Sequence, residues 1–434
     1  MSTFEAAGPW PAKAPKVALR AQIFGSSVPM APGTQPLKLS FSGQGGEFTR
    51  LCLRAGLFTV LTLGLYRFWF LTDTRRLLWR HTRVGSDSLE YRGTGKELLL
   101  GFLFALAILA PVYLGYFLLG IEAERYKAFA SAPFVLLLML FGVWASYRAR
   151  RYRLTRTVFR GARFWMKGSG FIYLLRYLAW GFATLLTLGL AYPWMAASLE
   201  RYKMSNTFYG DLRGSFEGDG WTFFKRGALL WLLSVPPSLK VAFTALRGMS
   251  TVPGHPNVVM APIGGFTSLF VPFALIFVLV MKGIEWRWWV EGLRFGQARV
   301  TSTLRAWFLL NEYFKLTVSM LAALLGAAIG VGIAAFVGKQ IVGPLPPLNV
   351  STFSSLAYQP PIVHAIASML LVAYLAMFVV MGTIYRRFLM FGVWRKVIDS
   401  LTLHDGQVFD NVKVAGFASS PVGEALADAL DFGF

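Results

Sequence analysis

Long apolar segments alternate with short segments rich in arginine and lysine along most of the chain. A helix needs about 20 apolar residues to cross the hydrocarbon core of a bilayer, and these segments have about that length. The eight segments are residues 49–71, 98–119, 129–147, 171–196, 227–247, 262–282, 313–338 and 362–385. The pattern predicts an all-α polytopic membrane protein, a helical bundle in which most helices span the membrane.

The first and fourth apolar segments contain the same helix break, Leu-Thr-Leu-Gly-Leu, with a tryptophan shortly after it. Shifting residues 45–95 by 125 positions gives fifteen identities without a gap, and a shift of 75 positions repeats part of the pattern. The shared positions of the break are Thr62, Gly64 and Trp69 in the first copy and Thr187, Gly189 and Trp194 in the second. Repetition over such a length predicts a bundle built from internal repeats, with small cytoplasmic β-hairpins after several helices.

These repeats suggest how the chain is divided. Proline-rich residues 1–37 are predicted to form a disordered cytoplasmic tail. Residues 38–128 hold the first repeat unit and the start of a membrane hairpin, and residues 129–261 hold the second unit. Residues 262–415 form a third, degenerate unit, and residues 416–434 form a C-terminal tail.

Composition supports a membrane location over binding to nucleic acid. Only 15% of the residues are charged, against about 25% in soluble domains. The formal net charge is +22, but most basic residues lie between apolar segments, as they do in cytoplasmic loops. The expected partners are therefore membrane lipids, with anionic headgroups at the cytoplasmic face, and no nucleic acid is expected. The expected location is a membrane, with several spans and both termini cytoplasmic; the oligomeric state is left open.

The charge pattern also conflicts with a simple series of spans. Residues 148–176 contain nine Lys or Arg and no acid, and residues 197–226 are basic too. Both would be cytoplasmic, yet they flank the single apolar segment 171–196. We therefore expect that segments 49–71 and 171–196 enter the membrane, turn at Thr-Leu-Gly and leave on the same side. Six full spans, as three hairpins, would remain; the alternative is eight simple spans.

The arginines that follow the aromatic residues are candidate lipid contacts. An arginine close to an anionic membrane surface contributes about 1 kcal/mol to attraction. The candidates for headgroup contact are Arg75, Arg76, Arg150, Arg151 and Arg201. Anchoring of the topology is the alternative role for the same side chains.

The sequence offers little support for catalysis. The four histidines are scattered, Cys52 is the single cysteine, and the apolar segments contain no Asp or Glu. We therefore expect no catalytic, cofactor-binding or metal site, and no enzyme. Lys240 lies deep within the segment 227–247, and it either reaches the interface or binds a substrate. Gly326 and Gly330, with Gly332, predict close helix packing within the bundle, and a dimer seam is the alternative.

The Leu-Thr-Leu-Gly-Leu helix with its tryptophan, the Arg-Arg pair and the later Thr-x-x-Gly spacing resemble the YjgN-like family of bacterial inner-membrane proteins, a domain of unknown function. The resemblance covers roughly residues 38–415 and weakens in the last unit, where no such break precedes Trp394. It implies a multi-pass inner-membrane protein and supplies no catalytic residue.

Two function classes remain open. One is a non-enzymatic membrane protein that binds lipid, scaffolds partners or helps to assemble the envelope. The other is a transporter or channel for a small neutral or anionic solute, because many transporters combine repeats with broken helices. A water-filled cavity lined by Thr62, Thr187 and Lys240 would favour transport.

Overall fold

The computed structural model describes residues 36–125, 131–230, 257–342, 361–416 and 428. These residues belong to one compact unit that begins at Pro36. Nearly all of the predicted tails at residues 1–37 and 416–434 lies outside them, as does Lys240. The internal domain boundaries predicted from the repeats stay predictions.

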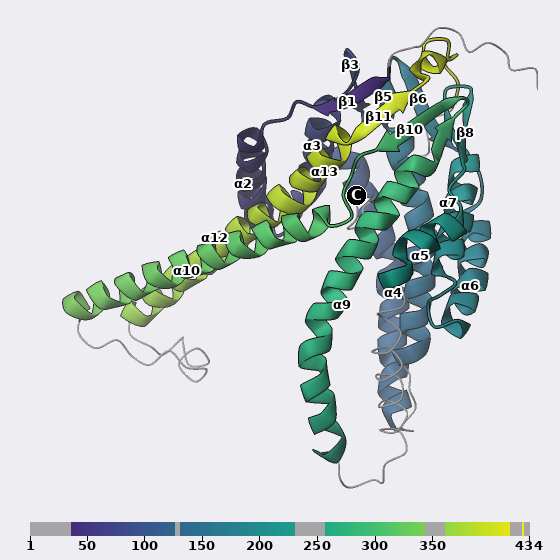
Figure 1. Ribbon diagram of the computed structural model, residues 1–434. Coiled ribbons are helices and arrows are strands. Elements are labelled where there is room, and N and C mark those ends of the chain that lie inside the picture. Colours follow the sequence, from purple (N-terminus) through teal and green to yellow (C-terminus); the bar gives the residue numbers. More distant parts are fainter. Residues whose placement is uncertain (1–35, 126–130, 231–256, 343–360, 417–427, 429–434) are drawn as a thin grey trace, which may run out of the picture. The chain divides into compact units, whose positions relative to one another are not determined.

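The described residues form one antiparallel sheet of eleven short strands, shown with the helices in Figure 1. The strands are β1 (Leu37–Phe41), β2 (Thr82–Val84), β3 (Asp87–Ser88), β4 (Glu90–Tyr91), β5 (Thr157–Phe159), β6 (Ala162–Met166), β7 (Thr207–Tyr209), β8 (Leu212–Phe216), β9 (Leu293–Phe295), β10 (Ala298–Ser302) and β11 (Leu401–His404). Their order is β3-β2-β1-β11-β10-β9-β8-β7-β6-β5-β4. The prediction of an all-α fold is therefore wrong, because the hairpins expected to be separate pair edge to edge.

The two ends of this strand order are joined by the chain itself. Strands β3 and β4 lie at opposite ends of the order, but Leu89 alone separates them in sequence. Ser88 pairs with Arg83 of β2, and Glu90 pairs with Val158 of β5. The sheet thus forms a nearly closed ring. Closure removes free strand edges, whose unpaired amide and carbonyl groups would otherwise need other partners.

Two kinds of connection alternate around the ring. Tight turns join β2 to β3, β5 to β6, β7 to β8 and β9 to β10. A glycine with positive φ lies in each: Gly85 (64°), Gly161 (77°), Gly210 (54°) and Gly296 (58°). Glycine suits these turns because it has no Cβ to clash in the left-handed region.

Helices make the other connections. They are α2 (Gly45–Leu61), α3 (Arg67–Arg80), α4 (Gly95–Arg125), α5 (Ser131–Thr155), α6 (Gly170–Leu186), α7 (Tyr192–Ser205), α9 (Asn257–Gly292), α10 (Phe308–Val342), α12 (Pro361–Tyr385), the π-helix η2 (Arg386–Gly392) and α13 (Val393–Asp399). Because the strands are antiparallel, the tight turns lie at one end of the ring and the helices leave from the other.

Each Thr-Leu-Gly break ends a helix with the same geometry. Leu63 and Gly64 after α2 have φ angles of 51° and 94°, and Leu188 and Gly189 after α6 have 51° and 92°. The amide of each glycine donates to the carbonyl of a threonine five residues earlier, at 2.7 Å. This is the Schellman closure of a helix end. The predicted helix break at Thr-Leu-Gly is thus found in both copies, and entry into a membrane at this turn stays a prediction.

Both ends of each short helical hairpin return to the sheet. Strands β1 and β2, which precede α2 and follow α3, pair directly with each other. Strands β6 and β7 do the same around α6 and α7. The chain therefore enters and leaves each of these two hairpins at the same end of the ring.

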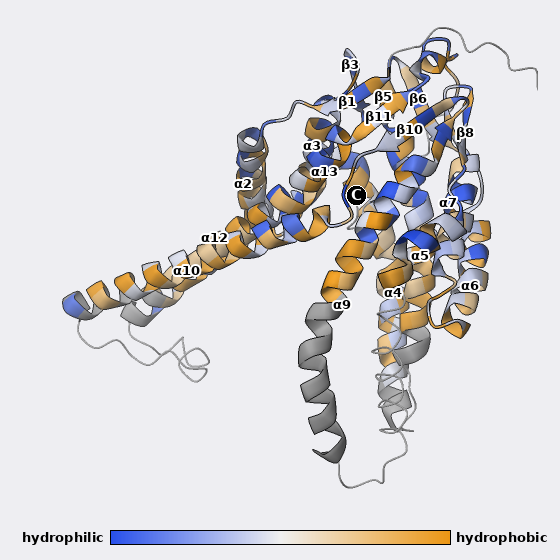
Figure 2. Ribbon diagram, viewed as in Figure 1, coloured by the Kyte–Doolittle hydropathy of each residue, from blue (hydrophilic) through white to orange (hydrophobic). Residues whose placement is uncertain are grey.

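Three helices of the described residues are long and apolar enough to cross a membrane: Gly95–Leu118, Phe308–Ala334 and Ala367–Asp399. Only 17%, 6% and 6% of their most apolar windows are buried, so their hydrophobic side chains face outward. Figure 2 shows hydrophobic residues along α10 and α12. The prediction of six spans thus has support for three helices, and Gly170–Leu186 is shorter.

Aromatic side chains fill the ring near its tight turns. Phe409, which ends the 3₁₀-helix η3 (Gly406–Phe409), lies against Phe159 of β5, Tyr209 of β7 and Phe295 of β9, with ring centroids 5.5–6.5 Å apart. These strands alternate around the sheet, so their side chains converge on one central residue. Convergence on Phe409 packs the interior of the ring.

Candidate functional site

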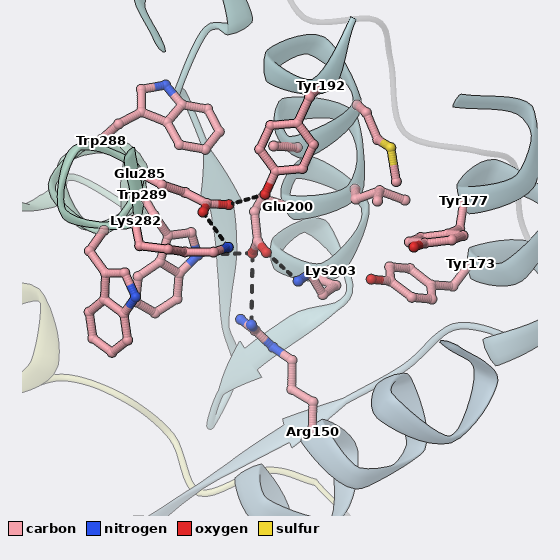
Figure 3. A pocket seen from close by; sticks show the side chains of 14 residues that line it. Arg150, Tyr173, Tyr177, Tyr192, Glu200, Lys203, Lys282, Glu285, Trp288 and Trp289 are labelled. Carbon is pink, nitrogen blue, oxygen red and sulfur yellow. Dashed lines mark hydrogen bonds and ion pairs between the residues drawn. The ribbon is translucent and has the colours of Figure 1, made fainter. Parts of the chain in front are cut away.

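A pocket of about 490 Å³ lies among helices α5, α6, α7 and α9 (Figure 3). It is lined by Arg150, Tyr173, Tyr177, Tyr192, Met195, Ala196, Leu199, Glu200, Lys203, Lys282, Glu285, Trp286, Trp288 and Trp289. Six of the fourteen lining residues are aromatic, and three cations and two carboxylates supply the charged groups. The pocket therefore has a net charge of +1.

Helical periodicity brings these side chains to one place. Tyr173 and Tyr177 are four residues apart on α6, and Glu200 and Lys203 are three apart on α7. Residues at these spacings lie on the same face of a helix. Pro193 occupies the first turn of α7, where a missing amide costs nothing, so the helix can start directly after the turn.

Glu200 is the centre of one charged group in the pocket. Its carboxylate forms an ion pair with Lys203, lies 3.7 Å from Arg150 Nη1, and accepts a 2.9 Å hydrogen bond from Trp289 Nε1. Burial alone would raise the pKa of this carboxyl, but Lys203 and Arg150 outweigh burial and hold the pKa below its usual range. Glu200 is thus ionised at neutral pH.

Glu285 is the centre of a second charged group. Tyr192 donates its hydroxyl to Glu285 Oε1 at 2.7 Å, and Lys282 Nζ lies 2.6 Å from Oε2. Burial, followed by the negative charge of Glu285, raises the pKa of Tyr192, so its hydroxyl remains a donor at neutral pH. Lys282 is half exposed, with 50% of its side chain accessible, so it can turn to another partner at little cost.

Arg150 has few hydrogen-bond partners for a guanidinium, although only 21% of its side chain is exposed. Its Nη2 lies 3.4 Å from the sulfur of Met204, and its ion pair with Glu200 is long. Its Nε is buried without a hydrogen-bond partner in the described part of the chain. A buried donor of this kind usually has a partner, so Arg150 has capacity for an added acceptor.

The aromatic wall is held rigidly. Trp288 donates its Nε1 to the carbonyl of Asp219 at 3.0 Å and stacks on Phe223 at 4.8 Å. Tyr173 lies beside Tyr147, with ring centroids 5.2 Å apart and the ring planes tilted by 30°. Ring faces carry partial negative charge, so walls of this type attract ammonium groups.

The pocket presents charged groups that can hold a ligand. Each of its two carboxylates pairs with a lysine, and neither a serine nor a cysteine lines the cavity. Over the described residues, no cluster of three His, Cys, Asp or Glu could hold a metal ion. Groups of both signs beside aromatic rings suit a ligand that itself carries both charges and an apolar part.

The arginines predicted to contact headgroups lie in different surroundings. Arg150 lines the pocket, and Arg151 follows it half-buried on α5. Arg75 is 3% exposed and paired with Asp428. Arg76 and Arg201 are exposed, and each donates to the carbonyl of a glycine 17 residues later, at 2.8 and 3.4 Å. The structure therefore brings one of the five into the pocket and does not gather the others there.

The hydroxyls of the helix break serve the turn itself. Thr62 Oγ1 donates to a carbonyl of α2 at 2.7 Å and accepts the amide of Tyr66 at 2.9 Å. Thr187 makes the equivalent bonds, at 2.8 Å to a carbonyl of α6 and 3.0 Å from the amide of Ala191. Neither threonine lines the pocket described above, so the structure does not unite them in one cavity there.

Trp69 and Trp194 have a packing role that the sequence did not indicate. A Cβ added to Gly95 would lie 2.9 Å from Trp69 Cα, and one added to Gly220 would lie 2.9 Å from Trp194 Cα. Only glycine permits so close a backbone approach. The repeated glycines therefore mark contacts between helices as well as turns.

Sequence reasoning missed four site residues: Tyr192, Glu200, Lys203 and Glu285. A signal was present for Glu200. The shifts of 75 and 125 positions align Arg75 with Arg150 and with Glu200, so the copies place a charge of either sign at one position. Side chains of opposite charge at equivalent positions of neighbouring repeat units are candidates for an ion pair, as Arg150 and Glu200 are here.

Fold and site together define a class of protein with membrane-length apolar helices mounted on a nearly closed antiparallel ring of strands. The family model described as "Bacterial protein of unknown function (DUF898)" matches residues 36–429. The chain belongs to this family, and the predicted resemblance to YjgN-like proteins is confirmed at that level.

Two curated relatives are both named "Inner membrane protein YjgN". That of Salmonella typhimurium (strain LT2) is 31% identical over 70 residues, which is 16% of this chain and 18% of the relative. That of Escherichia coli (strain K12) is 24% identical over 124 residues, or 29% of each chain. The alignments thus cover less than a third of the relatives' own length. No solved structure matches this chain.

Proposed function

We propose that the protein is a non-enzymatic phospholipid-binding protein of the bacterial inner membrane, and that the pocket around Arg150 and Glu285 receives a zwitterionic headgroup. The guanidinium of Arg150 carries the proposal: it has few hydrogen-bond partners and shares a pocket with carboxylates and tyrosine rings. Lipid fits this chemistry because neighbouring helices expose apolar side chains that a bilayer would cover.

The two charged groups correspond to the two poles of a phosphoethanolamine headgroup. The phosphate would accept hydrogen bonds from Arg150 and from Lys282, once Lys282 turns away from Glu285. The ammonium would then face Glu285, with Tyr173 and Tyr177 beside it. Such charge-assisted bonds contribute about 1.5–3 kcal/mol each.

The tips of the short helical hairpins support contact with lipid. Leu63 is 95% exposed and Leu188 is 67% exposed, and both have the left-handed backbone that normally favours glycine. An exposed leucine side chain is unfavourable in water and favourable in hydrocarbon. Burial of these side chains in a membrane would offset the backbone strain at the turn. In our proposal both hairpins dip into the membrane from the cytoplasmic side and leave by the same side, the apolar helix pairs span it, and both termini are cytoplasmic.

Transport of a small solute is the second candidate. Broken helices in repeated units favour it, since transporters often place substrate sites there. Two observations within the described residues count against it: the threonine hydroxyls of both breaks are engaged by their own turns, and Phe409 packs into the ring. We therefore place lipid binding first.

Calorimetric titration of the purified protein in a neutral detergent with short-chain phospholipids tests the proposal. Phosphatidylethanolamine should bind at least tenfold more tightly than phosphatidylcholine, whose trimethylated amine cannot donate to Glu285. Arg150→Gln should weaken binding about tenfold or more, the effect of losing one charge-assisted bond.

The matched control is Arg287→Gln, which removes the same charge from α9 outside this pocket. It should leave phosphatidylethanolamine binding unchanged. Equal affinity for the two lipids, or equal affinity of the Arg150→Gln variant and the unmodified protein, would overturn the proposal.

A further inference from the structure

A second pocket, of about 710 Å³, lies between the start of α10 and the segment formed by η2 and α13. It is separate from the pocket among α5, α6, α7 and α9 and shares no residue with it. Two helices of membrane-spanning length, Phe308–Ala334 and Ala367–Asp399, contribute to its walls. The pocket therefore lies where these helices meet strands β10 and β11.

This second pocket is strongly cationic. The cations that line it are Arg305, Lys315, Arg387, Arg395 and Lys396, and the two carboxylates are Glu312 and Asp399. The net charge of the lining is thus +3, against +1 for the first pocket. Clefts lined by one sign of charge concentrate ligands of the opposite sign.

The two carboxylates are already engaged by part of this charge. Glu312, which is 3% exposed, lies 2.6 Å from Lys396 Nζ and 3.3 Å from Lys315 Nζ. Asp399 lies 3.6 Å from Arg395 Nε and accepts a 2.9 Å hydrogen bond from the amide of Phe41. Both carboxylates are thus paired with cations other than Arg305 and Arg387.

Arg305 and Arg387 are the excess cations. Across the described ranges, no carboxylate lies within ion-pair distance of either guanidinium. Arg387 instead lies over the ring of Phe391, with its guanidinium carbon 4.7 Å from the centroid. Two arginines on one cavity without a carboxylate partner match the bidentate geometry that phosphate groups accept.

The π-helix η2 carries Arg387 on one wall of the pocket. Arg387, Phe391 and Arg395 are four residues apart, and residues at this spacing lie on one face of a helix. Short π-helical segments are frequent at functional sites.

The first turn of α2 adds to the positive potential beside Arg387. A Cβ at Gly45, the first residue of α2, would overlap Arg387 Nη2, so the guanidinium lies directly against that backbone. Aligned peptide dipoles give a helix N-terminus a partial positive charge. An anion bound by Arg387 would offset both charges at once.

We propose that this second pocket binds the phosphate group of an anionic ligand through Arg305 and Arg387. Trp307, with 64% of its surface exposed, provides an apolar rim for the rest of that ligand. The phosphate comes either from an anionic phospholipid in the membrane or from a soluble phosphate ester. The site is independent of the proposed headgroup pocket, so either proposal can fail alone.

Calorimetry in two arms tests the proposal and separates the sources. In one arm, the protein in phosphatidylcholine nanodiscs is titrated with inorganic pyrophosphate. In the other, short-chain phosphatidylglycerol is titrated into the protein in a neutral detergent. Arg305→Gln with Arg387→Gln should weaken whichever interaction occurs by at least tenfold.

A second variant protects the test against loss of folding. Gly45→Ala should displace the flexible end of Arg387 without disturbing backbone, so it should weaken binding while leaving thermal unfolding near that of the unmodified protein. The control, Arg213→Gln with Arg299→Gln, removes two exposed strand arginines away from the pocket and should bind normally.

The outcomes are distinct. Binding of phosphatidylglycerol alone, lost in the variants, supports a lipid ligand, and binding of pyrophosphate supports a soluble one. The proposal is overturned if neither ligand binds, or if the variants and the control bind equally.

Discussion

Arg75 and Asp428 form a bidentate ion pair although 353 positions separate them: Nη1 lies 2.5 Å from Oδ2, and Nη2 lies 3.1 Å from Oδ1. Only 4% and 0% of the two side chains are exposed. Arg75 also donates to the hydroxyl of Tyr91 at 3.1 Å, and Arg153 lies 3.5 Å from Asp428. The pair thus ties the C-terminal part of the chain to α3, β4 and α5.

Removing Asp428 should be strongly destabilising. Asp428→Ala leaves Arg75 buried without its carboxylate, which costs about 3–5 kcal/mol in comparable buried pairs. Thermal unfolding of the detergent-solubilised protein measures the loss. The control is Glu90→Ala, which breaks the exposed pair with Arg92 and should cost less than about 1 kcal/mol. Equal unfolding temperatures for the two variants would show that the buried pair contributes little.

Glu200 should make stability depend on pH. Its folded pKa lies below its unfolded pKa, so the ionised carboxylate stabilises the fold above the unfolded value. That contribution is lost as pH falls through the folded pKa. Glu200→Gln should lower stability at neutral pH by roughly 3 kcal/mol and flatten the acid limb of the stability profile. Glu217→Gln, on an exposed side chain, is the control and should keep the original profile.

The strained leucines of the helix breaks should be replaceable in detergent. Leu63→Gly and Leu188→Gly relieve a left-handed backbone and should each raise stability by about 1 kcal/mol. Leu61→Gly, within the last turn of α2, should instead lower it by about 1 kcal/mol. Thermal unfolding compares the three variants, and a loss of stability in the first two would refute strain at the turn.

Glycines of the apolar helices should differ sharply in their tolerance of alanine. A Cβ at Gly283 would overlap the backbone carbonyl of Ala306, so Gly283→Ala should cost about 1–3 kcal/mol or more. A Cβ at Gly326 or Gly330 would meet no described atom within 4 Å. Gly326→Ala should therefore be neutral or slightly stabilising. The expected packing within the bundle at these two glycines is thus not found.

Local signals in the sequence were enough to predict features within one repeat unit. The Thr-Leu-Gly breaks and turn glycines such as Gly85 and Gly210 could be recognised because a positive φ restricts the residue types at one position. The sheet could not, because strands of two to five residues carry too little alternation to predict their pairing. The assignment of all-α failed for that reason.

The candidate site was accessible to sequence reasoning only in part. Arg150 was identified because it follows an aromatic belt in a repeated unit. Glu200 and Glu285 come from helices 85 residues apart, and local spacing gives no reason to bring them together. Their roles depend on the packing of α7 against α9, which brings Trp289 to Glu200 and Tyr192 to Glu285.

The sequence by itself determined the apolar helices, the breaks that turn the chain back, the basic segments and the family resemblance. Each follows from hydrophobic length, backbone restriction or charge within a short stretch. Only the tertiary structure decided that the hairpins close into one ring, that Arg75 meets Asp428, and that opposite charges share a pocket. These contacts join residues far apart in the chain, and their energies depend on burial, which no local pattern of residues specifies.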